Sequence, residues 1–189
     1  MMSGIKEKIE AANAAYVKTK GEAAHPKKKF AILTCMDARM DPVRFAGLAD
    51  DAYVVRNAGG RVTDDAVRSL VVSAKLLGTT EWYVIHHTEC GMAGFTNEEM
   101  QALMAESVGP AEHTEDGWRN VSDEPGADAS FMDFMTIGDP EETLVDDVRR
   151  LRAHPLVSKK IPIYGYMYDI RTGALRECLR ASAAGKAEP

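Results

Sequence analysis

The chain has 189 residues, of which 45% are hydrophobic and 28% charged. These values are typical of a folded globular protein and exclude wholesale disorder, and the length predicts a single domain. The 23 basic and 29 acidic residues give a net charge of −6, which argues against nucleic acid or an anionic membrane as the main partner. No apolar run approaches the ~18 residues of a membrane span and no export signal is recognisable, so we expect a cytoplasmic protein.

Strand and helix signals alternate along the chain. Apolar positions at helical spacing predict a helix over residues 5–18, within an N-terminal arm that comprises residues 1–28. Short unbroken apolar runs, typical of strands buried on both faces, lie at residues 30–34, 52–55, 82–85 and 161–168. This alternation predicts an α/β fold with a mainly parallel central sheet of four to five strands flanked by helices.

Three further helices carry recognisable end signals. One spans residues 63–77 and is followed by Gly78, a natural C-terminal stop. The capping box Thr96-Asn97-Glu98-Glu99 opens a second helix. A third helix begins at Asp139-Pro140-Glu141-Glu142, where an N-cap residue is followed by proline at the first helical position.

Residues 108–136 fit no helix or strand pattern. They are rich in Gly, Pro, Asp, Glu and Ser, with Trp118 and Phe131 as candidate anchors. Structureless segments of this length are usually functional or disordered. We therefore expect a long excursion that acts as a lid or as an interface arm.

Residues that could bind a metal or act in catalysis directly follow three of the predicted strands. The three segments are Cys35–Arg39, Arg56–Gly60 and His86–Gly91. Ligands of open α/β sheets bind beyond the carboxyl ends of the strands. We therefore expect these segments to meet in one crevice.

Cys35, His87 and Cys90 form a candidate metal site. The His-x-x-Cys spacing lets one turn present two side chains to a single ion, and Cys35 adds a second thiolate. Zinc accepts thiolate and imidazole in a tetrahedral shell, and two sulfur ligands favour it over magnesium or calcium. Three cysteines do not indicate a disulfide framework, and Cys178 has no metal-ligating neighbour, so we interpret it as a core thiol.

Asp37 and Arg39 are the candidate catalytic residues. The arginine holds the carboxylate ionised, and the carboxylate can accept a hydrogen bond from water that zinc activates. Asp37 can also take the fourth zinc position itself, which leaves open whether that position is exchangeable. The alternative is a surface ion pair of little energetic weight. His86 alternates with His87 along a strand, so we interpret it as a hydrogen-bonded structural histidine.

These motifs resemble those of the β-class carbonic anhydrases. The resemblance extends from about residue 29 to residue 176 and rests on Cys35-x-Asp37-x-Arg39, Arg56-Asn57-Ala58-Gly59 and His87-x-x-Cys90-Gly91. It implies a β-carbonic-anhydrase-like fold and a homodimer or higher homo-oligomer. It also implies Zn2+ on Cys35, His87 and Cys90, with an Asp37–Arg39 dyad beside it. The same branch of the family includes enzymes that hydrolyse carbonyl sulfide or carbon disulfide.

Two departures from the family pattern bear on the substrate. Plant-type members carry a glutamine shortly before the second strand, whereas Leu48 stands at the corresponding position here and makes the pocket more apolar. The excursion at residues 108–136 is also longer than the compact branch of the family requires. Tyr53, Gly59 and Met92 are further candidates to line the substrate pocket.

The sequence therefore predicts a zinc enzyme for a small linear heterocumulene, with reversible hydration of carbon dioxide to bicarbonate as the first hypothesis. The alternative on the same site is hydrolysis of carbonyl sulfide to hydrogen sulfide and carbon dioxide, which Leu48 favours. A further alternative is a non-catalytic zinc-bearing or redox-sensing module. In that case zinc has no exchangeable water, or Cys35 and Cys90 oxidise as a pair once the metal is lost.

Overall fold

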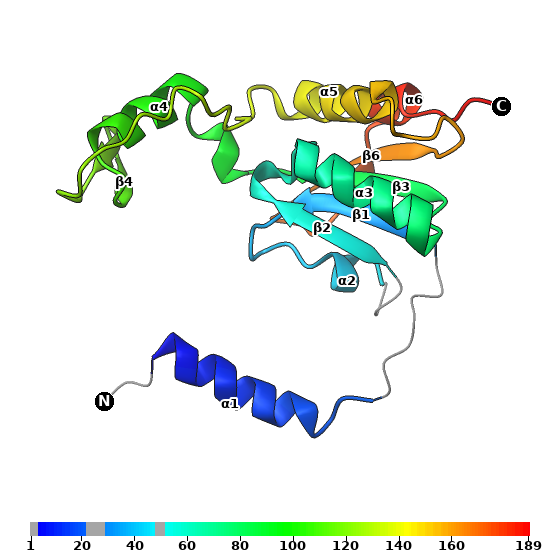
Figure 1. Cartoon of the computed structure of the whole chain (residues 1–189), viewed down its shortest axis with the longest axis horizontal. Coiled ribbons are helices and arrows are strands. Elements are labelled where there is room, and N and C mark those ends of the chain that lie inside the picture. Colours follow the sequence, from blue (N-terminus) through cyan, green and yellow to red (C-terminus); the bar gives the residue numbers. More distant parts are fainter. Residues whose placement is uncertain (1–3, 22–28, 48–51) are drawn as a thin grey trace.

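A computed structural model describes residues 4–21, 29–47 and 52–189 of the chain. Its centre is a five-stranded sheet with the order β2-β1-β3-β6-β7, in which only β7 is antiparallel (Figure 1). This sheet confirms the predicted α/β fold. Its strands are β1 (Phe30–Cys35), β2 (Tyr53–Asn57), β3 (Glu81–His87), β6 (Ile163–Tyr168) and β7 (Leu175–Glu177). The helices are α1 (Ile5–Val17), α2 (Pro42–Phe45), α3 (Asp64–Leu77), α4 (Asn97–Glu106), α5 (Pro140–Ala153) and α6 (Leu179–Ala184), with the 3-10 turns η1 (Ala58–Gly60) and η2 (Gly91–Ala93).

The main core lies between one face of the sheet and helices α3, α5 and α6. Leu70, Leu144 and Ala181, one from each helix, pack in the same buried cluster as Leu33 of β1 and Trp82 of β3. Every residue of β1 is buried, as expected for a strand covered on both faces. Burial of these apolar side chains is the main force that holds the parallel strands together.

The opposite face of the sheet has a thinner cover. Among the described residues, its buried cluster consists of Phe30, Ile32, Met40 and Ile85, with Phe45 of the short helix α2 packed against them. The neighbouring aromatic side chains are only partly buried, namely Tyr83, Tyr166 and Tyr168. A large apolar surface on this side is therefore left without a helix layer from the described part of the chain.

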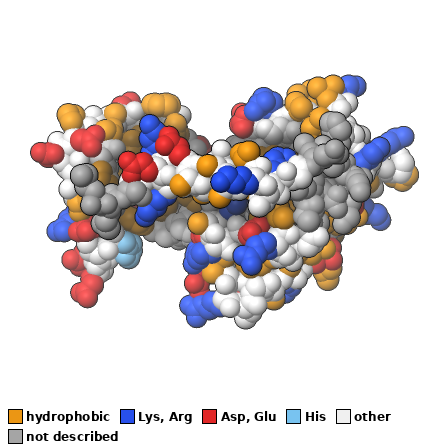
Figure 2. All heavy atoms as spheres, turned by 90° about the horizontal axis from the view of Figure 1, so that it is seen from below, with side chains coloured by type: hydrophobic (Ala, Val, Ile, Leu, Met, Phe, Trp, Pro, Cys, Tyr) orange, Lys and Arg blue, Asp and Glu red, His pale blue; other side chains and the backbone are white. Residues whose placement is uncertain are grey.

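Helix α1 lies apart from the sheet, on the side of its thinly covered face (Figure 1). None of its thirteen residues is buried, although Ile5, Ile9, Tyr16 and Val17 are large and apolar. Figure 2 views the molecule from this side and shows hydrophobic side chains among the charged ones on the surface. The helix predicted over residues 5–18 is confirmed, but its stability in isolation is marginal at this length.

The predicted helix ends are confirmed. The Thr63 hydroxyl accepts a hydrogen bond from Ala66 N at 3.2 Å, and Gly78 ends α3 with a φ of +75°. Thr96 and Glu99 cap α4 reciprocally, and Asp139 caps α5. None of the described helices is both long and apolar enough to cross a membrane.

The excursion contains order that the sequence pattern did not predict. Strands β4 (Ala111–Thr114) and β5 (Gly117–Asn120) form an antiparallel hairpin beside α4. Trp118 anchors it, because its indole nitrogen donates to the Gly94 carbonyl at 3.0 Å and its ring meets Phe95 edge-on. Phe131, the other predicted anchor, is 80% exposed and therefore does not anchor the excursion within one chain. Each of these strands has only four residues and lies among turn-forming residues. Neither is long enough to show a clear alternation of apolar and polar positions in the sequence.

Gly60 allows η1 to pack directly against β1. Its φ is +67°, and a Cβ at this position would lie 2.8 Å from Cys35 N and 2.9 Å from the Thr34 carbonyl carbon. Both atoms belong to the backbone of a central strand and cannot move aside. The close approach therefore helps to fix the end of β1.

We expect Gly60→Ala to lower the free energy of unfolding by about 2–5 kcal/mol, through the left-handed backbone and the overpacking together. Gly47→Ala is the matched control, because Gly47 has a similar φ of +64° and no described heavy atom within 4 Å of the added Cβ. It should lose only about 1–2 kcal/mol. Urea denaturation of both variants measures the difference, and equal losses would refute the packing argument.

Candidate metal centre

The carboxyl ends of β1 and β3 bring three metal-binding side chains together. Cys35 is the last residue of β1, His87 is the last residue of β3, and Cys90 follows in the next turn. All three are buried, and their ligand atoms lie within 4.8 Å of one another. The two sulfur atoms are 4.0 Å apart. The strands extend further than predicted, so that Cys35 and His87 lie within them rather than after them.

The His87 ring is oriented for a ligand role. Its Nδ1 lies 2.8 Å from the Thr88 carbonyl oxygen, so this nitrogen carries the proton. The buried Nε2 has no hydrogen-bond partner among the described residues. An unpartnered buried nitrogen is costly, and here it stands beside two sulfur atoms. This donor set fits zinc, which prefers sulfur and imidazole nitrogen.

The two thiols of the group differ in acidity. A hydrogen bond with Cys90 lowers the pKa of Cys35 despite its burial, and the amide of Asp37 also donates to the Cys35 sulfur, at 3.4 Å. The same interaction with Cys35 raises the pKa of Cys90. The pair therefore favours one thiolate, which is the form that binds a metal.

Asp37 and Arg39 form a bidentate ion pair at the edge of the group. Arg39 Nη2 donates to Asp37 Oδ2 at 2.7 Å, and Arg39 Nε donates to Oδ1 at 3.0 Å. This pairing lowers the pKa of Asp37 to about 2, so the carboxylate is ionised at neutral pH. Its Oδ2 lies 4.0 Å from His87 Nε2, which brings the carboxylate next to the candidate ligands.

Arg39 also holds the turn between the candidate ligands His87 and Cys90. Its Nη2 donates to the Glu89 carbonyl oxygen at 3.0 Å. Glu89 has a φ of +55°, which is uncommon for a residue other than glycine. Its carboxylate pairs with Arg171, in the turn after β6. Sequence reasoning missed Glu89 and Arg171, because residue spacing carries no signal for a left-handed backbone.

Arg56 supports the Cys35 turn from β2. Its Nε donates to the Cys35 carbonyl oxygen at 3.0 Å, and its Nη2 donates to the carbonyl oxygens of Asp37 and Met40 at 2.7 and 3.0 Å. The Arg56–Gly60 segment therefore does reach the same crevice as the other two motifs. Its arginine contacts the backbone that carries the candidate residues rather than their side chains.

Met92 and Gly59 lie close to the sulfur atoms. Met92 packs against the small cluster of Cys35, Cys90 and Ile137. Gly59 has a φ of +75°, and an added Cβ would lie 3.3 Å from Ile137 Cδ1. Ile137 was missed in the sequence, because it directly follows the excursion and no helical or strand periodicity points to it.

The other predicted residues lie elsewhere. Tyr53 begins β2, four residues or roughly 13 Å before Asn57, and packs against the main core. Within one chain it therefore does not reach the metal centre. Leu48 lies outside the described residues. His86 points away from the group, with Nε2 3.2 Å from Asp147 Oδ2, and Cys178 is buried in the main core.

Comparison with known proteins assigns the family. A model of the carbonic anhydrase family matches residues 30–175. The chain belongs to the β-carbonic anhydrase family. β-Carbonic anhydrase 1 of Mycobacterium tuberculosis is 37% identical over 153 residues, which cover 80% of this chain and 83% of the relative.

Other relatives in this family span two activities. A carbon disulfide hydrolase of an Acidianus species is 38% identical, covering 77% of this chain and 75% of the relative. The solved carbonic anhydrase of Streptococcus mutans superimposes with a TM-score of 0.79 at 40% identity, covering 94% of this chain and 99% of that structure. This member of the β-carbonic anhydrase family is therefore an enzyme whose relatives include carbonic anhydrases and carbon disulfide hydrolases.

We expect Arg39→Gln to raise the pKa of Asp37 from about 2 towards the ordinary value of 3.8, because the bidentate hydrogen bonds are lost. In the wild type, the ionised pair stabilises the fold above about pH 4, and this contribution disappears as the pH falls towards 2. Carbon-13 NMR titration of the Asp37 carboxyl measures the change. Arg68→Gln, which breaks an exposed pair with Asp65, should leave Asp37 unaffected. An unchanged midpoint in Arg39→Gln would contradict the assignment.

Proposed function

We propose that the chain is a zinc enzyme that catalyses the reversible hydration of carbon dioxide to bicarbonate. The observation that carries this proposal is the buried group of Cys35, His87 and Cys90 beside the ionised Asp37. Relatives named as carbonic anhydrases support the same reaction here.

Cys35, His87 and Cys90 would hold the Zn2+ ion. Two sulfur atoms and one imidazole nitrogen would leave one of the four ligand positions usual for zinc open for exchange. Bound zinc supplies a Lewis acid that lowers the pKa of water to about 7. We also propose a cytoplasmic location, because metal-binding thiolates persist in a reducing compartment.

Asp37 and Arg39 act on the reacting water in this proposal. The Asp37 carboxylate accepts a hydrogen bond from the water and thereby orients its remaining lone pair towards the substrate carbon. Arg39 keeps this carboxylate ionised, so that the carboxylate accepts a hydrogen bond and does not donate one. Its bond to the Glu89 carbonyl keeps the dyad next to the Cys90 turn.

The apolar neighbours of the group suit an uncharged substrate. Met92 and Ile137 pack against Cys35 and Cys90 and would limit access of further water molecules to a bound ion. The low polarity of these surroundings also suits the second candidate function, hydrolysis of carbonyl sulfide or carbon disulfide, because sulfur is less polar than oxygen. A relative named as a carbon disulfide hydrolase supports this alternative.

The decisive experiment compares three substrates on zinc-quantified protein at matched pH. We expect one zinc per chain and fast hydration of carbon dioxide, with slow release of hydrogen sulfide from carbonyl sulfide and carbon disulfide. Cys90→Ala should lose zinc and at least ~100-fold in rate, more than outer-shell changes usually cost. Cys178→Ala is the matched control, since this thiol lies in the main core and should leave zinc content and rate unchanged.

Other outcomes have distinct meanings. Efficient hydrogen sulfide release with feeble hydration would make the sulfur-containing heterocumulene the substrate. Failure on all three substrates with zinc fully bound would favour the non-catalytic module, or a site in which Asp37 takes the fourth position. Azide perturbs the absorption of the cobalt-substituted protein only if that position is exchangeable, which separates an exchangeable site from a closed one.

We further propose that the enzyme is a homodimer or higher homo-oligomer in which α1 packs on a second copy. An apolar set of side chains on a helix without buried residues indicates a contact surface. The thinly covered face of the sheet offers a matching apolar surface.

Ile9→Asp should therefore reduce the molar mass measured by light scattering after gel filtration. Ala11→Asp adds the same charge on the opposite, exposed face of α1 and should leave the mass unchanged. If both variants keep the wild-type mass, α1 is not the contact.

A further inference from the structure

Ile137 closes the metal centre on the side of the excursion. It is 5% exposed and packs with Cys35, Cys90 and Met92. Its amide donates to the Met92 carbonyl oxygen at 2.9 Å, which joins the end of the excursion to the turn after Cys90. Ile137 also lines an open cavity of about 380 Å³, together with the segments 93–96 and 136–138. Ile137 therefore borders both this cavity and the two cysteines.

Arg61 holds the backbone that precedes Ile137. Its side chain is only 11% exposed, and its Nη1 donates to the carbonyl oxygens of Met135 and Thr136, the latter at 2.7 Å. Met135 has a φ of +53°, and a strained backbone of this kind persists only where its surroundings hold it. The guanidinium group thus fixes the two peptides next to Ile137.

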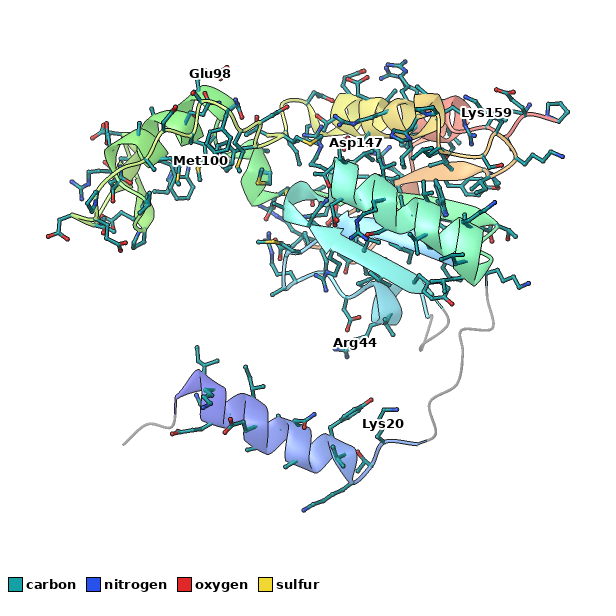
Figure 3. The ribbon with its side chains drawn as sticks, viewed as in Figure 1. Lys20, Arg44, Glu98, Met100, Asp147 and Lys159 are labelled. Carbon is teal, nitrogen blue, oxygen red and sulfur yellow. The ribbon has the colours of Figure 1, made fainter. Side chains whose placement is uncertain are left out.

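Asp147 on α5 fixes Arg61 in turn. Its carboxylate is 1% exposed and accepts from Arg61 Nε at 2.7 Å, and Figure 3 labels it on the side of α5 that faces the sheet. It also lies 3.2 Å from Nε2 of His86 on β3. Burial alone would raise the pKa of Asp147, but the bonds from His86 and Arg61 outweigh burial and lower it. The three side chains connect α5, β3 and the end of the excursion.

A contribution to stability alone does not account for the buried Arg61–Asp147 pair, because apolar residues can often replace such pairs without loss of stability. A buried ion pair does impose one geometry on the elements that it joins. We propose that Ile137 determines which linear triatomic ligand fits beside the metal, and that Arg61 is the positioning residue that sets the place of Ile137. The choice of ligand class rests on the proposed function.

The bulk of Ile137 favours ligands with small terminal atoms, such as oxygen or nitrogen, over those that end in sulfur. Azide and thiocyanate are linear triatomic anions that differ in this respect. Their dissociation constants can be measured from the absorption of the cobalt-substituted protein without any turnover. We expect Ile137→Ala to strengthen the binding of thiocyanate relative to that of azide on the order of tenfold. Removal of methylene groups from a pocket changes its discrimination between two ligands by about that factor.

Arg61→Lys tests the positioning role while keeping a positive charge beside Asp147, so that the fold is retained. Lysine cannot reach Asp147 and the two carbonyl groups at once. We expect this variant to shift the thiocyanate-to-azide ratio in the same direction, and to have no further effect in an Ile137→Ala background. Arg68→Lys on α3, which pairs with exposed Asp65, is the matched control and should leave the ratio unchanged.

An unchanged ratio in Ile137→Ala, with an intact cobalt–thiolate spectrum, would overturn the proposal for Ile137. Additive effects of Arg61→Lys and Ile137→Ala would show that Arg61 does not act through Ile137. A merely structural Arg61 lowers the melting temperature and leaves the ratio unchanged, which would also refute the positioning role. If the ratios shift as expected but no heterocumulene is turned over, the proposed function fails while this inference holds.

Discussion

The metal centre depends on holding two buried sulfur atoms 4.0 Å apart while one of them carries a negative charge. Neither the sheet nor the core achieves this alone, because Cys35 and Cys90 stand on separate turns. Gly60 lets a backbone turn press against the end of β1, and the strained Glu89 turn carries Cys90 back towards it. The remaining features of the site hold these two turns in place relative to each other.

Arginine side chains carry out most of this positioning. Arg39 and Arg56 donate to backbone carbonyl oxygens beside the candidate ligands, and Arg61 donates to those that precede Ile137. Arg39 and Arg61 also pair with a carboxylate. A planar guanidinium group suits this role because it has several donors in a fixed fork. Lysine, with one compact charge, cannot connect a carboxylate and two peptides in the same way. The site is thus held by polar contacts to the main chain, whereas the sheet is held by apolar burial.

The sequence was sufficient to predict elements and motifs that carry local signals. The apolar runs predicted the four parallel strands, and Thr63, Thr96 and Asp139 marked helix starts that the structure confirms. The convergence of Cys35, His87 and Cys90 followed from the rule that parallel strands end at one edge.

Features that depend on tertiary contacts were not accessible from the sequence. Short elements such as α2, β4, β5, β7 and α6 have too few residues for periodicity. The contacts of Arg61 with Asp147 and of Ile137 with the sulfur pair join residues that lie far apart in the chain. Tyr53 was predicted to line the pocket and is close in sequence to the Arg56–Gly60 segment. Within one chain, however, it lies at the opposite end of β2 from this segment.

The order of the strands has a consequence for how the protein matures. β1 lies between β2 and β3, and β3 follows α3 along the chain, so Cys35 meets His87 only after a complete crossover has formed. Contacts of such long sequence separation form slowly, because the loop entropy is lost before the contacts are gained. An ion that binds the finished group more tightly than the unfolded chain shifts the folding equilibrium by mass action. For the zinc enzyme that we propose, metal supply during synthesis would therefore help to determine how much of the chain reaches its native state.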